Sequence, residues 1–148
     1  MELIRDYLDL TVFSVLGIMS FLVIWFSIER SLFYRSIRLN SFHRIEHLQI
    51  ALTRHLTLIS SIGSNAPYIG LLGTVFGIML TFYDMGQSNN IDTQAIMVGL
   101  SLALKATAMG LFVAIPSIIF YNALLRRVDV LTTTWIADFK QEPANETL

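Results

Sequence analysis

The chain has 148 residues, of which 54% are hydrophobic and only 14% are charged, and its formal net charge is −1. Because the apolar residues gather in three long uncharged runs, the composition indicates an all-α integral membrane protein and leaves no separate soluble core of useful size. The chain contains no cysteine. That absence excludes a disulfide framework and any metal or redox site built on cysteine.

The first uncharged run, residues 10–28, predicts the first membrane helix. The preceding segment MELIRDYLDL is partly acidic, and no small-residue cleavage site follows it, so we do not expect a secretory signal. Beyond an arginine-rich stretch, apolar residues recur at three- and four-residue steps over residues 42–59. This spacing predicts an amphipathic helix over about 41–65 that continues directly into the second span.

The second span covers about 66–83, and its small and polar residues share one helical face. Pro67 stands near the start of the span, where the missing backbone hydrogen bond is expected to kink the helix. Gly73 and Gly77 form a G-x-x-x-G, a spacing that lets another helix approach closely. The stripe on this face contains Gly63, Pro67, Gly70, Thr74, Gly77, Thr81 and Asp84.

The third span covers about 99–125 and also carries a narrow stripe of small residues. The two stripes predict that spans two and three pack against protein. Span one is apolar all round except for Ser14, Gly17 and Ser20, and is expected to face lipid. The tail at 126–148 continues as an amphipathic helix as far as Pro143 and packs beside the 41–65 helix. Residues 1–148 are therefore expected to form a single membrane domain. The third-span stripe consists of Gly99, Ala103, Thr107, Gly110, Ala114, Ser117 and Tyr121.

The basic residues fall unevenly along the chain. Eight of the ten lie within residues 29–54 or after span three, whereas the short turn Asp84–Asp92 has none. By the positive-inside rule, the arginine-rich segment and the C-terminus are expected in the cytoplasm and the N-terminus on the outer side.

Several side chains allow more than one interpretation. Lys105 is the one basic residue inside an apolar run. Because a charge at the bilayer centre costs about 2.5 to 3.5 kcal/mol, Lys105 either serves an ion path or a carboxylate partner, or it snorkels to the outer interface. Thr74 and Thr107 either line a polar path or bond the carbonyl four residues back. His43 and His47 have a metal-ligand spacing, but without a third ligand a solvated helix surface is the better interpretation.

None of the three spans contains an aspartate or a glutamate. A proton relay made by this chain alone therefore lacks a titratable acid, and a partner must supply the carboxylate if the protein works on protons. No nucleophile arrangement, phosphate loop or paired carboxylate stands inside the membrane, so we do not expect an enzyme. The basic residues follow membrane topology and do not predict a nucleic-acid surface.

Two segments, SNAPYIGLLGTVFGIM at 64–79 and ALKATAMGLFVAIPSIIFYN at 103–122, resemble the signature segments of the ExbB/TolQ family, a more distant relative of the MotA flagellar stator. The resemblance covers roughly residues 60–127. It implies a pentameric homo-oligomeric ring in the inner membrane of a Gram-negative bacterium, built around membrane helices of the single-span partner ExbD. It also implies that proton motive force drives TonB, which powers outer-membrane import of iron chelates, vitamin B12 or metals. Neither a cofactor nor a metal is implied, and the proton-carrying aspartate of the family belongs to ExbD.

Individual residues match the family's motifs. Thr74 and Thr107 match its pore-facing threonines, Pro67 and Pro116 match its helix prolines, and Asn122 matches the asparagine that closes the third-helix motif. The glycines that this resemblance and the stripes together assign to helix packing are Gly70, Gly73, Gly77 and Gly110.

The sequence departs from the family at one position of the proposed proton path. The family usually has a glutamate five residues before its third-span threonine, and here that position is Leu102, with Lys105 one turn further on. We expect Lys105 to contact a partner or a lipid headgroup near the outer mouth of the ring. The chain is also short for the family. A TolQ-type subunit that serves outer-membrane constriction and a non-conducting membrane scaffold stay open as alternatives.

Overall fold

The computed structural model contains four α-helices within the residues that it describes, 2–39, 42, 44–87 and 93–145. By length and composition, three helical segments of this part of the chain can cross a membrane. This confirms an all-α integral membrane protein with three candidate spans. The helices are α1 (Glu2–Ser36), α2 (Ile45–Thr53), α3 (Leu56–Gln87) and α4 (Thr93–Asn145).

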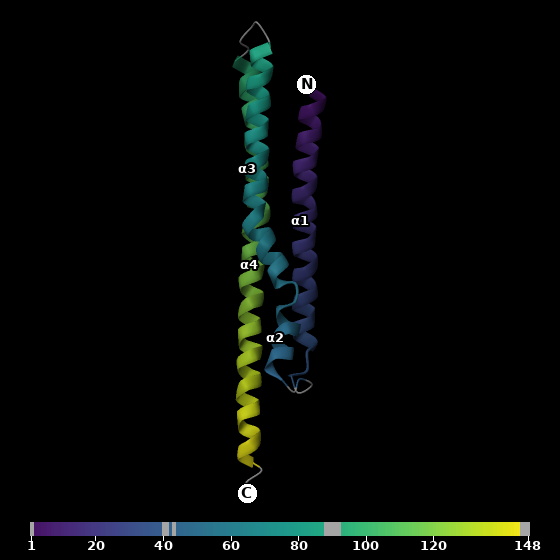
Figure 1. Cartoon of the computed structure of the whole chain (residues 1–148), viewed down its shortest axis with the longest axis vertical. Helices are drawn as coiled ribbons and strands as arrows, with labels where there is room; N and C mark the ends of the chain where they lie inside the picture. The colour runs from purple at the N-terminus through teal and green to yellow at the C-terminus, as the bar shows by residue number, and fades with distance from the viewer. Residues whose placement is uncertain (1, 40–41, 43, 88–92, 146–148) are drawn as a thin grey trace.

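The helices form an elongated bundle (Figure 1). α3 and α4 lie side by side over most of the length of α3 and share the most extensive interface of the molecule. α1 runs along this pair, and the short α2 lies between α1 and α4 at the end that also holds the C-terminus. α1 begins at the same end of the bundle at which α3 ends.

The close approach of α3 and α4 follows from the small residues of their facing stripes. Gly70 and Gly110 lie back to back, so a Cβ added to Gly70 would stand 2.6 Å from the Ala106 carbonyl oxygen, and one added to Gly110 would stand 2.7 Å from that of Ala66. A Cβ on Gly77 would lie 2.8 Å from that of Ala103. Between apolar helices, such backbone contact gives the packing that the hydrophobic effect does not supply in lipid.

The outer faces of all three long helices are apolar and exposed. On α4, three bulky residues outside the stripe, Leu111, Ile115 and Ile118, are exposed. α1 exposes Phe21 to the outside, but its opposite side is buried, with Leu16 only 1% exposed. The buried side contradicts the expectation that span one faces lipid all round, and for the exposed side that expectation stays a prediction. Spans two and three bury their stripes and still present apolar surface for lipid or for another protein.

At the α2 end of the bundle, α2 packs against α4. The largest fully buried side chains there are Leu48, Leu52 and Ile59, from α2 and the start of α3. On α4, the indole nitrogen of Trp135 donates a hydrogen bond to the carbonyl of Phe42, at 3.1 Å. α4 runs through position 143 to Asn145, so the expectation that Pro143 ends the helix is wrong.

The single helix expected over 41–65 and on into span two is wrong at residues 54–55. The structure has two helices in this segment, since α2 ends at Thr53 and α3 begins at Leu56. Residue 41, the expected start, lies outside the described residues. His55 between them has a positive φ of 68°.

The break has a tertiary cause. In a continuous helix the carbonyls of Ala51 and Leu52 would accept from the backbone four residues on. Here Arg30 donates to the Ala51 carbonyl at 3.2 Å, and the Tyr34 hydroxyl donates to the Leu52 carbonyl at 2.6 Å. Side chains of α1 therefore cap the end of α2.

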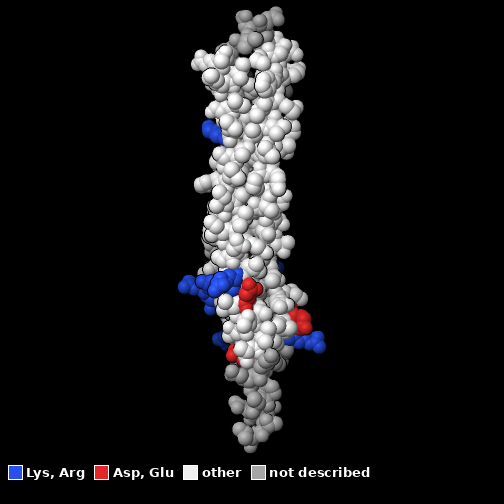
Figure 2. Space-filling view, turned by 90° about the vertical axis from the view of Figure 1, so that its left-hand side faces the viewer, with Lys and Arg blue, Asp and Glu red and all other residues white. Residues whose placement is uncertain are grey.

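The charged side chains on the face seen in Figure 2 gather at the end of the bundle near α2, below a long uncharged band. One isolated basic group interrupts this band. Between Arg54 and Arg126 the sequence contains one basic residue, Lys105.

Candidate functional site

The structure brings Thr74 of α3 and Thr107 of α4 together inside the α3–α4 interface, next to the crossing of Gly70 and Gly110. Thr74 is only 7% exposed, and Thr107 is half-buried. Their two hydroxyl oxygens contact each other directly. The glycines make this contact possible, because a Cβ on Gly70 would lie 3.1 Å from the Cα of Thr107 and would keep the helices apart.

Each threonine also reaches backbone carbonyls. The Thr74 hydroxyl oxygen lies 3.0 Å from the carbonyl oxygen of Ala103 on α4 and 3.3 Å from that of Gly70 on its own helix. The Thr107 hydroxyl oxygen lies 3.4 Å from the Gly70 carbonyl oxygen, across the interface. The pair therefore bridges the two helices in both directions.

Two hydroxyl protons serve the carbonyls of Ala103 and Gly70 and the contact between the hydroxyls. Besides donation from Thr74 to the Gly70 carbonyl of its own helix, the pair has two satisfied arrangements in which the final acceptor lies on the opposite helix. In one, Thr107 donates to Thr74, which donates to the Ala103 carbonyl. In the other, Thr74 donates to Thr107, which donates to the Gly70 carbonyl. Rotation of the two hydroxyls interconverts them without breaking the contact between the helices. The site can thus orient a polar group or a water molecule, but it holds no acid.

Two other buried hydroxyls of α3 and α4 each donate to the carbonyl four residues back on their own helix, which was the alternative expected for Thr74 and Thr107. Thr81 donates to the Gly77 carbonyl at 2.8 Å, and Ser117 donates to the Val113 carbonyl at 2.6 Å, in both cases four residues back. Thr74 reaches its own helix as well as α4, and the Thr107 hydroxyl contacts the Thr74 hydroxyl and the Gly70 carbonyl, both on α3. The interhelical contact separates these two threonines from the local pattern.

Lys105 and Leu102 do not join the threonine pair. Lys105 is exposed on α4 and forms no ion pair or hydrogen bond with the side chains that the structure describes. Leu102, at the position of the family's usual glutamate, is half-buried. Within one chain these two residues therefore make no polar connection to Thr107.

The residues assigned to helix packing fall into two groups. The four glycines at 70, 73, 77 and 110 are buried where α3 and α4 cross. Pro67 is half-buried inside α3, which continues through it, and Pro116 and Asn122 are exposed on α4.

A polar cluster that the sequence did not predict lies where α1 meets the break between α2 and α3. Arg30 is 4% exposed, donates to Glu29 at 2.6 Å and lies over the ring of Phe33. His55 Nδ1 stands 3.3 Å from a carboxylate oxygen of Glu29, and its ring packs against Phe26. No spacing in the sequence indicates this cluster, because its members come from two segments more than twenty residues apart, and the sequence alone assigns Arg30 only to membrane topology.

The histidine pair yields no metal site. His43 lies outside the described residues, and His47 is exposed on α2. Among the described residues no three His, Cys, Asp or Glu side chains are grouped as metal ligands.

Comparison with known proteins agrees with this architecture. The sequence profile of the MotA/TolQ/ExbB proton channel family matches residues 30–136. The chain is 58% identical over 132 residues to the Biopolymer transport protein ExbB of Helicobacter pylori, covering 89% of this chain and 91% of that protein. It is 50% identical over 131 residues to a putative ExbB-like 2 protein of Helicobacter pylori, covering 88% and 87%.

A third relative extends the similarity to another organism. The Biopolymer transport protein ExbB of Aquifex aeolicus is 48% identical over 137 residues, which are 93% of this chain and 93% of that protein. The reduced length noted in the sequence is therefore shared by these relatives. On the match to the profile and on these identities, the chain belongs to the MotA/TolQ/ExbB proton channel family.

Proposed function

We propose that this chain is the channel and motor scaffold subunit of a TonB system. In this proposal the chain forms a homo-oligomeric, pentameric ring in the inner membrane and works with an ExbD-like single-span subunit. Proton motive force then energises TonB for outer-membrane import of iron chelates, vitamin B12 or metals. A TolQ-type role is the nearest alternative, and the relatives named ExbB favour the TonB branch.

The observation that carries the proposal is the buried contact between Thr74 and Thr107 in spans that hold no acid. Two hydroxyls that can exchange donor and acceptor roles can form hydrogen bonds to both a carboxylate and a water molecule. They cannot themselves take up a proton near neutral pH. The carboxylate must come from the partner. Each elementary charge that crosses is worth about 2.3 kcal/mol per 100 mV, so few protons can drive a conformational cycle.

The proposal is tested by replacing the threonines with valine, which has nearly the same shape and no hydroxyl. Thr74→Val and Thr107→Val are each expected to abolish TonB-dependent uptake while native mass spectrometry of the complex in mild detergent still finds the assembled ring. Assembly should survive because an interhelical hydrogen bond in a membrane contributes only about 0.6 to 2 kcal/mol.

Two variants control the experiment. Thr74→Ser keeps the hydroxyl and should retain uptake. Ser117→Ala removes a buried α4 hydroxyl that donates only to the carbonyl four residues back, and should also retain uptake. Normal uptake by both valine variants would contradict the proposal and favour a non-conducting scaffold. Proton flux through the chain without a partner would favour a self-contained transporter.

A further inference from the structure

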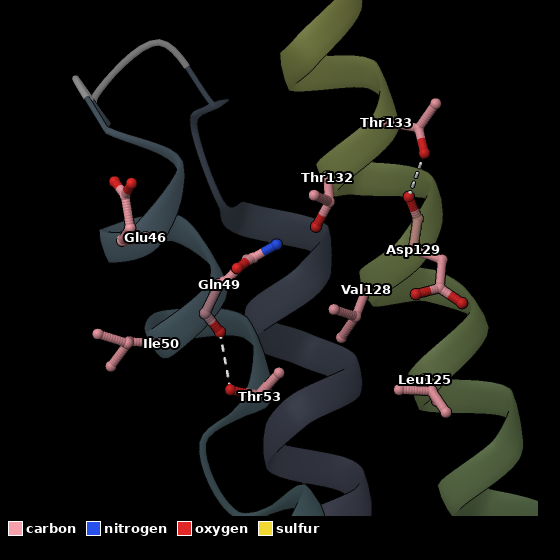
Figure 3. Close-up of a pocket in the computed structure, with 9 residues that line it drawn as sticks. All are labelled: Glu46, Gln49, Ile50, Thr53, Leu125, Val128, Asp129, Thr132 and Thr133. Carbon is pink, nitrogen blue, oxygen red and sulfur yellow. Dashed lines mark hydrogen bonds between the residues drawn. The ribbon is translucent and has the colours of Figure 1, made fainter.

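An open groove of about 700 Å³ lies between α2 and α4, at the end of the bundle where the charges gather (Figure 3). α2 contributes Glu46 and Gln49 to one wall, and α4 contributes Asp129 and Thr132 to the other. Val128, which is 5% exposed, lies deeper between these walls. We call this the acidic groove, because Glu46 and Asp129 are the only charged residues among the described residues that line it.

Both carboxylates of the acidic groove are available to a ligand. Glu46 and Asp129 are exposed, and neither forms an ion pair with the side chains that the structure describes. Two of the three threonine hydroxyls that line the groove are already committed, since Thr53 donates to the Gln49 carbonyl and Thr133 to the backbone carbonyl of Asp129 (Figure 3). The groove therefore presents two carboxylates with no basic side chain among its described lining residues, and a basic occupant would complement this charge.

Another face of α4 has the opposite charge. Arg126 and Arg127 line a second cavity of about 470 Å³ together with Tyr34 of α1 and Val130 of α4. Both arginines are exposed, and neither pairs with a carboxylate among the described residues. We call this the arginine face.

The acidic groove and the arginine face lie at one height on roughly opposite sides of α4. Each helical residue turns about 100° and rises about 1.5 Å, so residues 126, 127 and 130 share one side while 125, 129 and 132 share the other. Along the axis, the two arginines stand only about 3 to 4.5 Å from Asp129. Copies inserted in one membrane with the same orientation would bring the two faces to the same level.

We propose that the acidic groove of one copy receives Arg126 and Arg127 of the next copy. The two faces are complementary in charge, equal in height and oppositely directed, and this is the geometry of a head-to-tail contact that closes into a ring. Exposed ion pairs contribute little stability each, so the contact selects which faces meet and in which register. The inference rests on the proposed function in one respect, that the chain assembles with itself.

The absence of cysteine makes a direct test possible. Gln49→Cys places a thiol in the acidic groove, and Ala123→Cys places one on the arginine face. Membranes that hold the full chain with both substitutions are treated with a short bis-maleimide. We expect a ladder of cross-linked multimers from the double variant, and cross-linked dimers when the two single variants are co-expressed.

Each single variant alone should give no cross-link, because a head-to-tail contact keeps like positions apart. Dimers from Gln49→Cys alone would show a two-fold symmetric contact and overturn the inference. Monomers only, from the double variant and from the co-expressed single variants, would overturn it as well, and would leave a lipid headgroup as the occupant of the arginine face.

Charge reversal tests the chemistry of the contact in the same cross-linking assay. Arg126→Glu with Arg127→Glu should reduce the yield of cross-link by about tenfold or more, since like charges then face each other. Adding Glu46→Arg and Asp129→Arg to that chain should restore the ladder. Asp138→Arg, an exposed acidic position of α4 outside the acidic groove, is the matched control and should leave the yield unchanged.

Unchanged yield after the arginine reversal, or no recovery after the second pair of changes, would overturn the inference. The readout is independent of proton flow. A ladder in a chain that supports no TonB-dependent uptake would therefore contradict the proposed function and leave the head-to-tail contact in place. TonB-dependent uptake by a chain that gives no ladder would overturn the head-to-tail contact and leave the proposed function in place.

Discussion

At the scale of single residues, Thr74 and Thr107 differ from Ser117 in what their oxygen atoms contact. The Ser117 hydroxyl donates to a carbonyl of its own helix. The two threonine hydroxyls contact each other, and each also contacts a backbone carbonyl of the facing helix. A hydroxyl that bonds its own helix offers little to a neighbour, because its one proton is already used. The interhelical contact leaves the proton of each threonine with a choice of acceptors, and this choice is the chemical property of the site.

A second prediction at the scale of single residues concerns Lys105. It is exposed and has no partner among the described side chains, so its charge must be met by water, by a headgroup or by another protein. We expect Lys105→Ala to lower TonB-dependent uptake partially without loss of the folded chain. Lys105→Arg keeps the charge and should retain uptake. Undiminished uptake by Lys105→Ala would remove Lys105 from the functional residues.

At the scale of helices, the α3–α4 crossing depends on backbone contact at Gly70. A Cβ there would meet the Ala106 carbonyl oxygen at 2.6 Å, and neither helix backbone can yield without separating the pair. The same separation would pull Thr74 from Thr107. Small residues thus keep the hydroxyls of Thr74 and Thr107 in contact.

Gly70→Ala is therefore expected to destabilise the folded chain. Overpacking of this kind costs about 1 to 3 kcal/mol, and thermal unfolding in detergent should show a lower midpoint. Gly17→Ala is the matched control, since a Cβ at Gly17 meets no atom within 4 Å. A midpoint for Gly70→Ala equal to that of the control would show that the helices do not cross this closely.

The break between α2 and α3 gives a second prediction for the helices. Tyr34→Phe removes the donor to the Leu52 carbonyl, and an unsatisfied buried acceptor costs about 1 to 3 kcal/mol. The end of α2 should open more often, so trypsin should cut faster after the exposed Arg54. Mass spectrometry of the fragments measures the rate. Tyr68→Phe, at a tyrosine that is 68% exposed, should leave the rate unchanged, and equal rates in both variants would count against this cap.

At the scale of the whole molecule, the long helices place α2 at one end of the bundle and the end of α3 at the other (Figure 1). The charged groups seen in Figure 2 gather at the α2 end. Since basic residues are retained on the cytoplasmic side, we predict that α2 lies in the cytoplasm.

Single cysteines in this cysteine-free chain test the orientation. Gln87→Cys, at the end of α3, should react with a membrane-impermeant maleimide in cells whose outer membrane has been opened. Gln49→Cys on α2 should react only after the inner membrane is disrupted. The opposite pattern of labelling would reverse the predicted topology.

The sequence by itself determined the class of the protein, its three spans and the face of α3 and α4 that packs. These features follow from local properties, namely the length of an uncharged run and the spacing of small residues along one helix. The same stripes located Gly70, Gly110 and both threonines on the packing face. Only the tertiary structure decided that the threonine hydroxyls meet, because Thr74 and Thr107 are 33 positions apart in the sequence and their contact depends on how α3 and α4 are aligned along each other.

The tertiary structure also decided the break at residues 54–55 and the acidic groove. Apolar spacing continues from α2 into α3, so the sequence predicted one helix there, whereas Arg30 and Tyr34 of α1 take the carbonyls that would have extended it. The acidic groove exists because the turn after Thr53 lets α2 fold against α4 and sets Glu46 opposite Asp129. Periodicity describes one helix at a time, and these features arise between helices.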